Sequence, residues 1–186
     1  MLKHGILGLL NYTAMTGYEL KEVFEDSLNY FWTAQTSQIY RELQVLEKNG
    51  WAKSTLVEQS GKPDKKIFHI TETGKEELLR WLAQDDVGFT MRTPLLMKVF
   101  FLGEKSVEEN LDFFRGFRQM IATYMEGLQM ATGNAEFYSN IINTGQKAIY
   151  WDMTLDFGKR SMQTYLDWAD ECIKKLETIK ETDISG

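Results

Sequence analysis

The side chains best suited to recognising another molecule lie between residues 36 and 48. On a helix that turns by about 100° per residue, one sector of this segment is polar. That sector carries Ser37, Arg41, Gln44 and Lys48. Arginine pairs with guanine and glutamine with adenine, whereas serine and lysine hold phosphates. The opposite sector carries Ile39, Leu43 and Leu46, which predicts a buried face. The segment is therefore predicted to read DNA, although any surface helix also has a polar stripe.

The first turns of this helix add to the predicted DNA contact. A recognition helix uses its N-terminal turns, where the positive end of the helix dipole also favours phosphate. Residues with suitable side chains occupy these turns: Thr36, Ser37, Gln38, Tyr40 and Arg41. Together with Gln44 and Lys48 they form the DNA-contacting set that we expect on this helix.

A second group of cations lies in and beside the turn-forming stretch 59–65. Lys62, Lys65 and Lys66 surround Pro63, which stiffens the chain and lowers the entropy that is lost on binding. Asp64 partly offsets their charge. The segments on either side have the composition of strands, so the pattern predicts a β-hairpin with a cationic tip. Such a tip suits DNA phosphates, although lysine is also common in solvated hairpin turns.

The overall charge neither supports nor excludes a nucleic-acid partner. The chain has 21 Lys and Arg against 27 Asp and Glu, a net charge of −6. Residues 1–84 carry 10 basic and 11 acidic side chains, which leaves 11 and 16 for residues 85–186. The acidity therefore lies mainly in the second half, and phosphate binding depends on a local cationic surface rather than on the total.

No arrangement of residues predicts an enzyme. His4 and His69 lie far apart and form neither a metal-ligand spacing nor a nucleophile–base pattern, so no metal or cofactor is expected. Cys172 falls on an apolar stripe, where an inert buried thiol is expected rather than a redox sensor. The single cysteine, and the lack of any apolar run of about 20 residues, predict a cytoplasmic protein without a membrane span.

The elements that must position these side chains follow the order helix, helix, helix, hairpin, helix. Apolar periodicity begins at Ile6, and Thr16 with Glu19 forms a capping box for a second helix. The third helix starts near Thr36 and stops at Gly50. Strands are expected at 53–58 and 66–70, followed by a helix capped by Thr71. This order predicts a winged helix-turn-helix domain over residues 1–84, mainly α with a small β-hairpin.

The second half is predicted to be entirely helical. Periodicity lapses from Gln84 to Pro94, which places a domain junction there, with an all-α domain over residues 85–186. Ser106 and Glu109 form a second capping box. The helix that follows carries two apolar stripes: Phe113, Phe117, Met120 and Tyr124, and Leu111, Phe114, Ile121, Met125 and Leu128. So broad an apolar surface needs partners on more than one side, and we expect dimerisation.

The sequence closely resembles the PadR family of transcriptional regulators. The matching stretches keep the family's order and spacing across nearly all of residues 1–84. They are Gly5-Ile6-Leu7-Gly8-Leu9-Leu10, Thr16-Gly17-Tyr18-Glu19-Leu20, Phe31-Trp32, Gln38-Ile39-Tyr40, Glu42-Leu43, Leu46-Glu47, Gly61-Lys62-Pro63-Asp64-Lys65-Lys66 and Ile70-Thr71-Glu72-Thr73-Gly74. The second half resembles, on looser motifs, the longer branch of the family with a virulence-activator-like C-terminal domain. Those motifs are Phe89 to Leu96, Phe100-Phe101, Trp151 to Gly158, and Trp168.

The resemblance implies a homodimeric winged-helix regulator, usually a repressor, whose C-terminal helices form the dimer. Some members release DNA on binding phenolic acids or other aromatic compounds, and others are activators without a known ligand. One departure bears on the operator. Arg41 stands where the family often has proline after Tyr40, so the family's operator preference does not transfer directly.

A small aromatic effector would need a cavity in the second half. Phe89, Tyr150 and Trp151 could line such a cavity, and Arg92 would suit a carboxylate. Aromatic side chains at helical spacing are also typical of a core or a dimer interface, so that alternative stays open. A rival from another class is a ligand-sensing or protein-interaction module that kept the winged fold, which the acidic second half permits.

Overall fold

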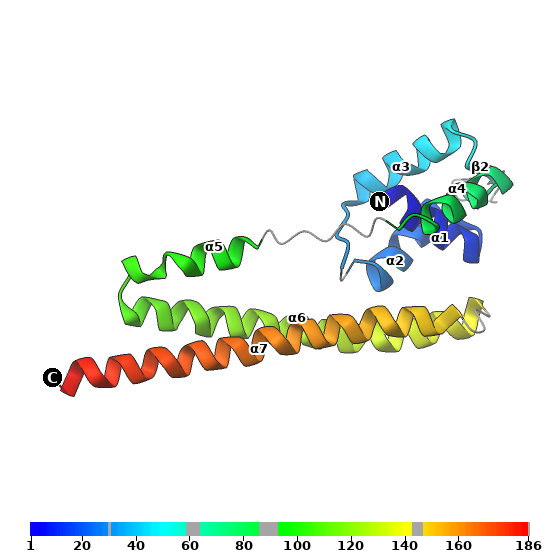
Figure 1. Ribbon diagram of the computed structural model, residues 1–186. Helices are drawn as coiled ribbons and strands as arrows, with labels where there is room; N and C mark the ends of the chain where they lie inside the picture. The colour runs from blue at the N-terminus through cyan, green and yellow to red at the C-terminus, as the bar shows by residue number, and fades with distance from the viewer. Residues whose placement is uncertain (30, 59–63, 86–92, 143–146, 186) are drawn as a thin grey trace. The chain divides into compact units, whose positions relative to one another are not determined.

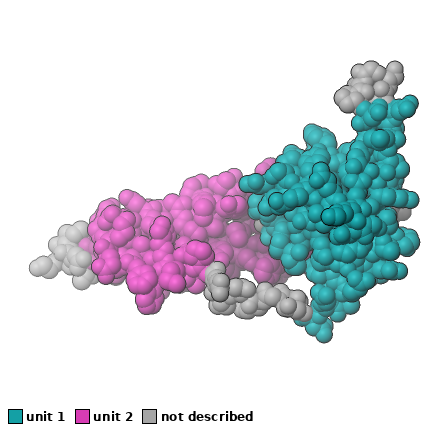
Figure 2. Space-filling model, turned by 90° about the horizontal axis from the view of Figure 1, so that it is seen from above, with its two compact units in different colours: residues 1–87, 131–152 teal, residues 88–130, 153–186 magenta. Residues whose placement is uncertain are grey.

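The computed structural model describes residues 1–29, 31–58, 64–85, 93–142 and 147–185 (Figure 1). The chain divides into two compact units (Figure 2). Unit 1 comprises residues 1–87 and 131–152, and unit 2 comprises residues 88–130 and 153–186. The sequence boundary expected near residues 84–85 stays a prediction, because each unit also contains a segment from the long C-terminal helices.

Unit 1 begins with three short helices, as the sequence predicts. They are α1 (Leu2–Tyr12), α2 (Gly17–Ser27) and α3 (Thr36–Lys48). The capping box of α2 is confirmed, because Glu19 N donates to Thr16 Oγ1 at 3.1 Å and Thr16 N donates to Glu19 Oε2 at 2.8 Å. Helix α3 ends before Gly50, whose φ of 71° favours glycine, so the expected stop is also confirmed.

A small antiparallel sheet follows the helices. Strands β2 (Ala52–Val57) and β3 (Lys65–Ile70) form the expected hairpin, and each begins one residue earlier than predicted. A two-residue strand, β1 (Met15–Thr16), completes the order β1-β3-β2. Strand β1 was not expected, because two residues are too few to show an alternating pattern. Because β1 lies directly before α2 and is paired with β3, the sheet connects the start of α2 to the hairpin.

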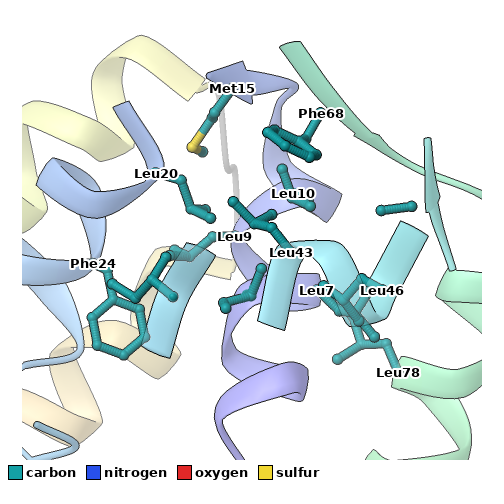
Figure 3. Close-up of a cluster of buried hydrophobic side chains, with 13 residues drawn as sticks. Leu7, Leu9, Leu10, Met15, Leu20, Phe24, Leu43, Leu46, Phe68 and Leu78 are labelled. Atoms are coloured by element: carbon teal, nitrogen blue, oxygen red, sulfur yellow. The ribbon is translucent and has the colours of Figure 1, made fainter. Parts of the chain in front are cut away.

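Apolar faces of these elements share one core, shown in Figure 3. The face of α3 predicted to be buried is buried, since Ile39, Leu43 and Leu46 are all at most 1% exposed. They pack with Ile6, Leu7, Leu20 and Phe24 from α1 and α2. Complete burial of such side chains contributes roughly 1.5–3 kcal/mol each. The core therefore fixes which side of α3 faces outward.

The start of α4 (Glu72–Leu82) is joined to the start of the hairpin by hydrogen bonds to the backbone of Gly50 and Trp51; we call this connection the joint. Thr71 N donates to Trp51 O at 3.0 Å, and Thr71 Oγ1 donates to Gly50 O at 2.6 Å. The same hydroxyl accepts from Gly74 N at 3.1 Å, which confirms the predicted cap at Thr71. The end of α3, the start of β2 and the start of α4 therefore meet within a few residues.

Helices α1 and α4 are connected by a polar cluster. Glu77 accepts from Lys3 Nζ at 3.0 Å and from Arg80 Nη1 at 2.6 Å, and its Oε1 lies 3.1 Å from His4 Nε2. The buried His4 ring is stacked on Trp81 with centroids 4.6 Å apart. Burial lowers the pKa of His4 below its ordinary value, which outweighs the opposite effect of the hydrogen bond to Glu77.

This cluster is expected to make the stability of the protein fall between pH 7.5 and pH 5.5. The unfolded chain takes up a proton at His4 more readily than the folded chain, so the free energy of unfolding falls as the pH drops through about 6.5. Chemical unfolding at the two pH values measures this loss, which should be smaller in His4→Gln. The lowered pKa of Glu77 acts only below its ordinary range, outside this window. Equal losses in both proteins would show that His4 does not carry the effect.

Unit 2 is helical, as expected. It contains α5 (Pro94–Phe100), a short 3-10 helix η1 (Leu102–Glu104), and most of α6 (Val107–Ile142) and α7 (Ala148–Ser185). The capping box of α6 is confirmed by Glu109 N, which donates to Ser106 Oγ at 3.3 Å. None of the helices, in the part of the chain that the structure describes, is long and apolar enough to cross a membrane.

Within unit 2, α6 and α7 run antiparallel. Arg115 is paired with Glu177 at 3.1 Å, and Phe114 meets Trp168 edge to face at 5.6 Å. The stripe that begins at Leu111 is buried at Leu111, Phe114, Ile121 and Leu128. In the other stripe Phe117 meets Tyr165 and Trp168 edge to face, each at 6.0 Å, whereas Met120 and Tyr124 are exposed. Cys172 is half-buried, and burial raises the pKa of its thiol, which disfavours the reactive thiolate.

Candidate nucleic-acid interface

Helix α3 presents its polar stripe to solvent. All four members of the stripe are exposed, on the side opposite the buried face: Ser37, Arg41, Gln44 and Lys48. Arg41 and Lys48 form no ion pair with any described residue, so their charges are available to a ligand. A row of exposed donors with two uncompensated cations suits the edges and phosphates of a nucleic-acid groove.

The N-terminal turns of α3 divide the predicted contacts into two kinds. Thr36 and Ser37 are exposed, as a phosphate contact requires. Gln38 is half-buried, and its Oε1 accepts from Gln35 N at 2.8 Å, so this side chain closes the start of the helix. Its Nε2 amide is the group left for a base or phosphate.

Tyr40 is oriented by α2 rather than by its own helix. A Cβ built on Gly17 would lie 2.6 Å from Tyr40 Cε1, so the ring rests directly on the glycine backbone. The side chain remains 42% exposed. Gly17 is therefore a residue of the site that sequence reasoning missed, although its place inside the capping box of α2 was a usable signal.

A hollow of about 540 Å³ is bordered by the start of α2, by α3 and by the hairpin. It is lined by Thr16, Gly17, Tyr18, Glu19, Tyr40, Gln44, Asp64, Lys65, Lys66 and Phe68. Tyr18 is 61% exposed and was not among the predicted contacts. The hollow brings two predicted residues of α3, Tyr40 and Gln44, together with Lys65 and Lys66 of β3, whereas Thr36, Ser37, Gln38, Arg41 and Lys48 do not line it.

The three predicted lysines of the hairpin have different surroundings. Lys65 is exposed and forms no ion pair with a described residue. Lys66 is paired with Glu47 at 2.8 Å, and its ammonium lies 4.9 Å from the centre of the Phe68 ring. Lys62 lies outside the described residues. Of the two predicted lysines that the structure describes, Lys65 is therefore the one whose charge is available to an external anion.

Glu47 connects α3 to the hairpin. Its Oε2 accepts from Lys66 Nζ, and its Oε1 accepts from Ser54 Oγ at 2.5 Å. Burial raises the pKa of Glu47, but the hydrogen bonds from Lys66 and Ser54 outweigh it and hold the pKa below its ordinary value. The carboxylate is thus ionised at neutral pH. Sequence reasoning did not assign Glu47 to the site.

The predicted effector residues are only partly described. Phe89 and Arg92 lie outside the described residues. Tyr150 is exposed, and Trp151 is half-buried in unit 1, where its Nε1 donates to Tyr12 Oη at 3.1 Å. The two rings meet edge to face at 5.2 Å. No group of three or more His, Cys, Asp and Glu side chains could hold a metal ion among the residues described.

Comparison with known proteins matches both halves of the chain to sequence families. Residues 6–80 match the transcriptional regulator PadR-like family, and residues 91–177 match the virulence activator alpha C-terminal domain. The negative transcriptional regulator PadR of Bacillus subtilis is 33% identical over 130 residues, which cover 69% of this chain and 71% of that protein. The chain belongs to the PadR family.

Other members extend the comparison. A probable transcriptional regulator of Mycobacterium tuberculosis is 49% identical over 83 residues, which cover 45% of this chain but only 44% of that protein. The crystal structure of B. subtilis PadR with operator DNA is 26% identical, has a TM-score of 0.78, and covers 94% of this chain and 98% of that one. The crystal structure of B. subtilis PadR with p-coumaric acid is 25% identical, has a TM-score of 0.72, and covers 95% of this chain and 98% of that one.

These comparisons confirm the winged-helix fold and the class of function. The chain is a DNA-binding transcriptional regulator of the PadR type, and the family consists of regulators rather than enzymes. The exposed stripe of α3, the hollow beside it and the hairpin form the candidate DNA interface of this chain.

Proposed function

We propose that this chain is a homodimeric repressor that reads an inverted-repeat operator with helix α3 of each protomer. The observation that carries the proposal is the opposed burial of α3, whose apolar face is fixed in the core while Arg41 and Gln44 are exposed. Two such helices enter successive major grooves about 34–36 Å apart, which requires half-sites separated by about one turn of DNA. Within this proposal the protein acts in the cytoplasm.

Within this proposal, the residues of unit 1 have distinct roles. Arg41 and Gln44 contact base edges, and Thr36, Ser37 and Lys48 contact phosphates. Tyr40 and the amide of Gln38 contact the groove beside them. Lys65 and Lys62 contact phosphates that flank the groove. Residues 1–84 form the DNA-binding domain, and residues 85–186 form the domain for dimerisation and effector binding.

Exposed apolar side chains in unit 2 support the homodimer. Phe100 is 81% exposed and Phe157 is 73% exposed, and both belong to helices of the proposed dimerisation domain. Met97, which is 67% exposed, lies one turn before Phe100 on α5, and a contiguous exposed apolar surface favours a partner. Sedimentation at micromolar concentration is expected to give the mass of two chains, and a single-chain mass would contradict the dimer.

A small aromatic or phenolic ligand is proposed to release the DNA. The structure of B. subtilis PadR with p-coumaric acid supports this class of ligand for a relative. Phe89, Arg92, Tyr150 and Trp151 are the residues proposed to contact it. Adding p-coumaric acid to the protein–DNA complex should then free the DNA.

A second candidate is an activator, or a winged-helix ligand-sensing or protein-interaction module, without ligand-controlled repression. The match of residues 91–177 to the virulence activator domain favours the activator. Activator and repressor differ in where the operator lies relative to the promoter. Transcription in vitro from the regulated promoter distinguishes them, because the repressor lowers the yield of transcript.

The test of the proposal is a gel shift with the DNA upstream of the chain's own gene. A retarded band that survives excess random competitor DNA is expected. A band that the competitor removes completely would contradict operator recognition at that site.

Lys65→Met is expected to weaken binding to every DNA sequence by about the same factor. One phosphate contact contributes about 0.9 to the slope of log K against log salt concentration, so the slope should fall by about that amount. Fluorescence anisotropy titrations at several salt concentrations, with operator and with random duplex, measure both quantities. A loss confined to the operator would show that Lys65 contacts bases rather than phosphates.

A further inference from the structure

One carboxylate bridges the recognition helix and both strands of the hairpin, in addition to the apolar core that they share. Glu47 lies near the C-terminal end of α3, and each of its oxygens accepts a hydrogen bond from a different strand. Ser54 of β2 donates to Oε1 at 2.5 Å, and Lys66 of β3 donates to Oε2 at 2.8 Å. A carboxylate bridged in this way ties α3 to both strands at once.

The register of the hairpin explains why these groups meet. Ser54 is paired with Phe68 and Leu56 with Lys66, so all four side chains are on the same face of the sheet. Lys66 lies over the buried Phe68 ring, with 4.9 Å between the ammonium and the ring centre. The ammonium of Lys66 therefore contacts both the Phe68 ring and the carboxylate of Glu47.

An ionised carboxylate at the position of Glu47 is electrostatically unfavourable, both for the helix and for binding to DNA, unless neighbouring groups stabilise it. A negative charge near the C-terminus of a helix opposes the helix dipole. A negative charge beside a DNA-binding surface also repels phosphates. The side chain of Glu47 is 25% exposed and that of Lys66 is 46% exposed, so the pair is partly withdrawn from water. Two hydrogen bonds to the carboxylate offset these costs.

We propose that Glu47 is a positioning residue that fixes the hairpin to the recognition helix, and that Lys66 neutralises Glu47 instead of a DNA phosphate. This inference rests on the proposed DNA-binding function. It assigns the phosphate contact of β3 to Lys65. It also makes operator specificity depend on a fixed angle between helix and hairpin, because both elements must fit one stretch of DNA at the same time.

The first test compares Lys66→Met with Lys65→Met, since methionine keeps most of the apolar stem. Binding to the operator is measured by anisotropy at several salt concentrations. Lys65→Met should lower the salt slope by about 0.9, whereas Lys66→Met should leave the slope unchanged while it weakens operator binding. Equal reductions of the slope in the two variants would overturn the assignment of Lys66.

The second test compares Glu47→Gln with Glu42→Gln, which removes the same charge from the same helix. Both substitutions should raise the affinity for random duplex DNA about threefold through charge. Only Glu47→Gln should also weaken operator binding, so that the ratio of operator to random affinity falls about tenfold or more. An unchanged ratio in Glu47→Gln would overturn the proposal, and a merely destabilised protein would not gain affinity for random DNA.

A measurement without DNA separates this inference from the proposed function. In the free protein, backbone amides of residues 65–70 should exchange with solvent faster in Glu47→Gln than in Glu42→Gln, because the hairpin loses the ion pair and one of the two hydrogen bonds to Glu47 of α3. Equal exchange in the two variants would overturn the positioning role of Glu47. A wild-type protein without operator preference would instead overturn the proposed function, whatever the exchange result.

Discussion

Gly74→Ala is expected to unfold unit 1 under mild conditions. A Cβ at this position would lie 2.0 Å from the Trp51 carbonyl oxygen and 2.9 Å from Ile70 Cγ1. The oxygen is a backbone atom that also accepts from Thr71 N, so it cannot move without opening the joint between the hairpin and α4. Overpacking against backbone costs about 3 kcal/mol or more, which lowers the melting temperature by roughly 12 °C or more. Thermal unfolding followed by circular dichroism measures the shift.

Gly8→Ala is the matched control for this prediction. Gly8 is in the middle of α1, and no described atom lies within 4 Å of a Cβ built there. Alanine in a helix interior is favoured over glycine by about 0.5–1 kcal/mol, so the melting temperature should rise slightly. A melting temperature for Gly74→Ala within a few degrees of the wild type would show that the backbone at Trp51 can move to accept a methyl group. It would contradict the close packing of Gly74 against Trp51.

Arg41→Ala is expected to cause the largest loss of operator specificity among single substitutions on α3. An arginine that pairs with guanine contributes about 1–3 kcal/mol of discrimination, so operator affinity should fall roughly 5-fold to 150-fold. Affinity for random duplex should fall less, because there the substitution removes only one sequence-independent electrostatic contact. Competition titrations with operators that carry single base-pair changes identify the position at which the variant no longer discriminates.

Arg160→Ala removes the same charge from unit 2, where Arg160 is paired with Asp156. It is expected to leave the ratio of operator to random affinity unchanged. A uniform loss of affinity in Arg41→Ala, with discrimination intact at every base pair, would mean that Arg41 contacts phosphate. The base-reading role would then belong to Gln44.

Local signals in the sequence were sufficient to predict most of unit 1. The capping box at Thr16, the stop at Gly50 and the apolar face of α3 each depend on residues within a few positions of one another, and all three are present as predicted. The family's motifs added the order of the elements. The exposed stripe of α3 followed from the same periodicity, because burying one face of a helix exposes the other.

Contacts between distant residues could not be predicted in this way. The bond between Glu47 and Lys66 joins residues 19 positions apart, and it changes the expected role of Lys66. The contact between Tyr40 and Gly17, and that between Gly74 and Trp51, likewise depend on how separate elements pack. Strand β1 forms only because β3 supplies its partner. Such features depend on tertiary geometry, which periodicity and capping do not specify.

Selection from a randomised duplex library tests the central claim most directly, because the library contains every candidate half-site. The purified chain should enrich an inverted repeat whose half-sites lie about one helical turn apart. The Arg41→Ala chain should enrich a sequence with relaxed preference at one position in each half-site. Failure of the wild-type chain to enrich any sequence, with no retention of duplex DNA even at low salt, would contradict the claim that helix α3 reads an operator.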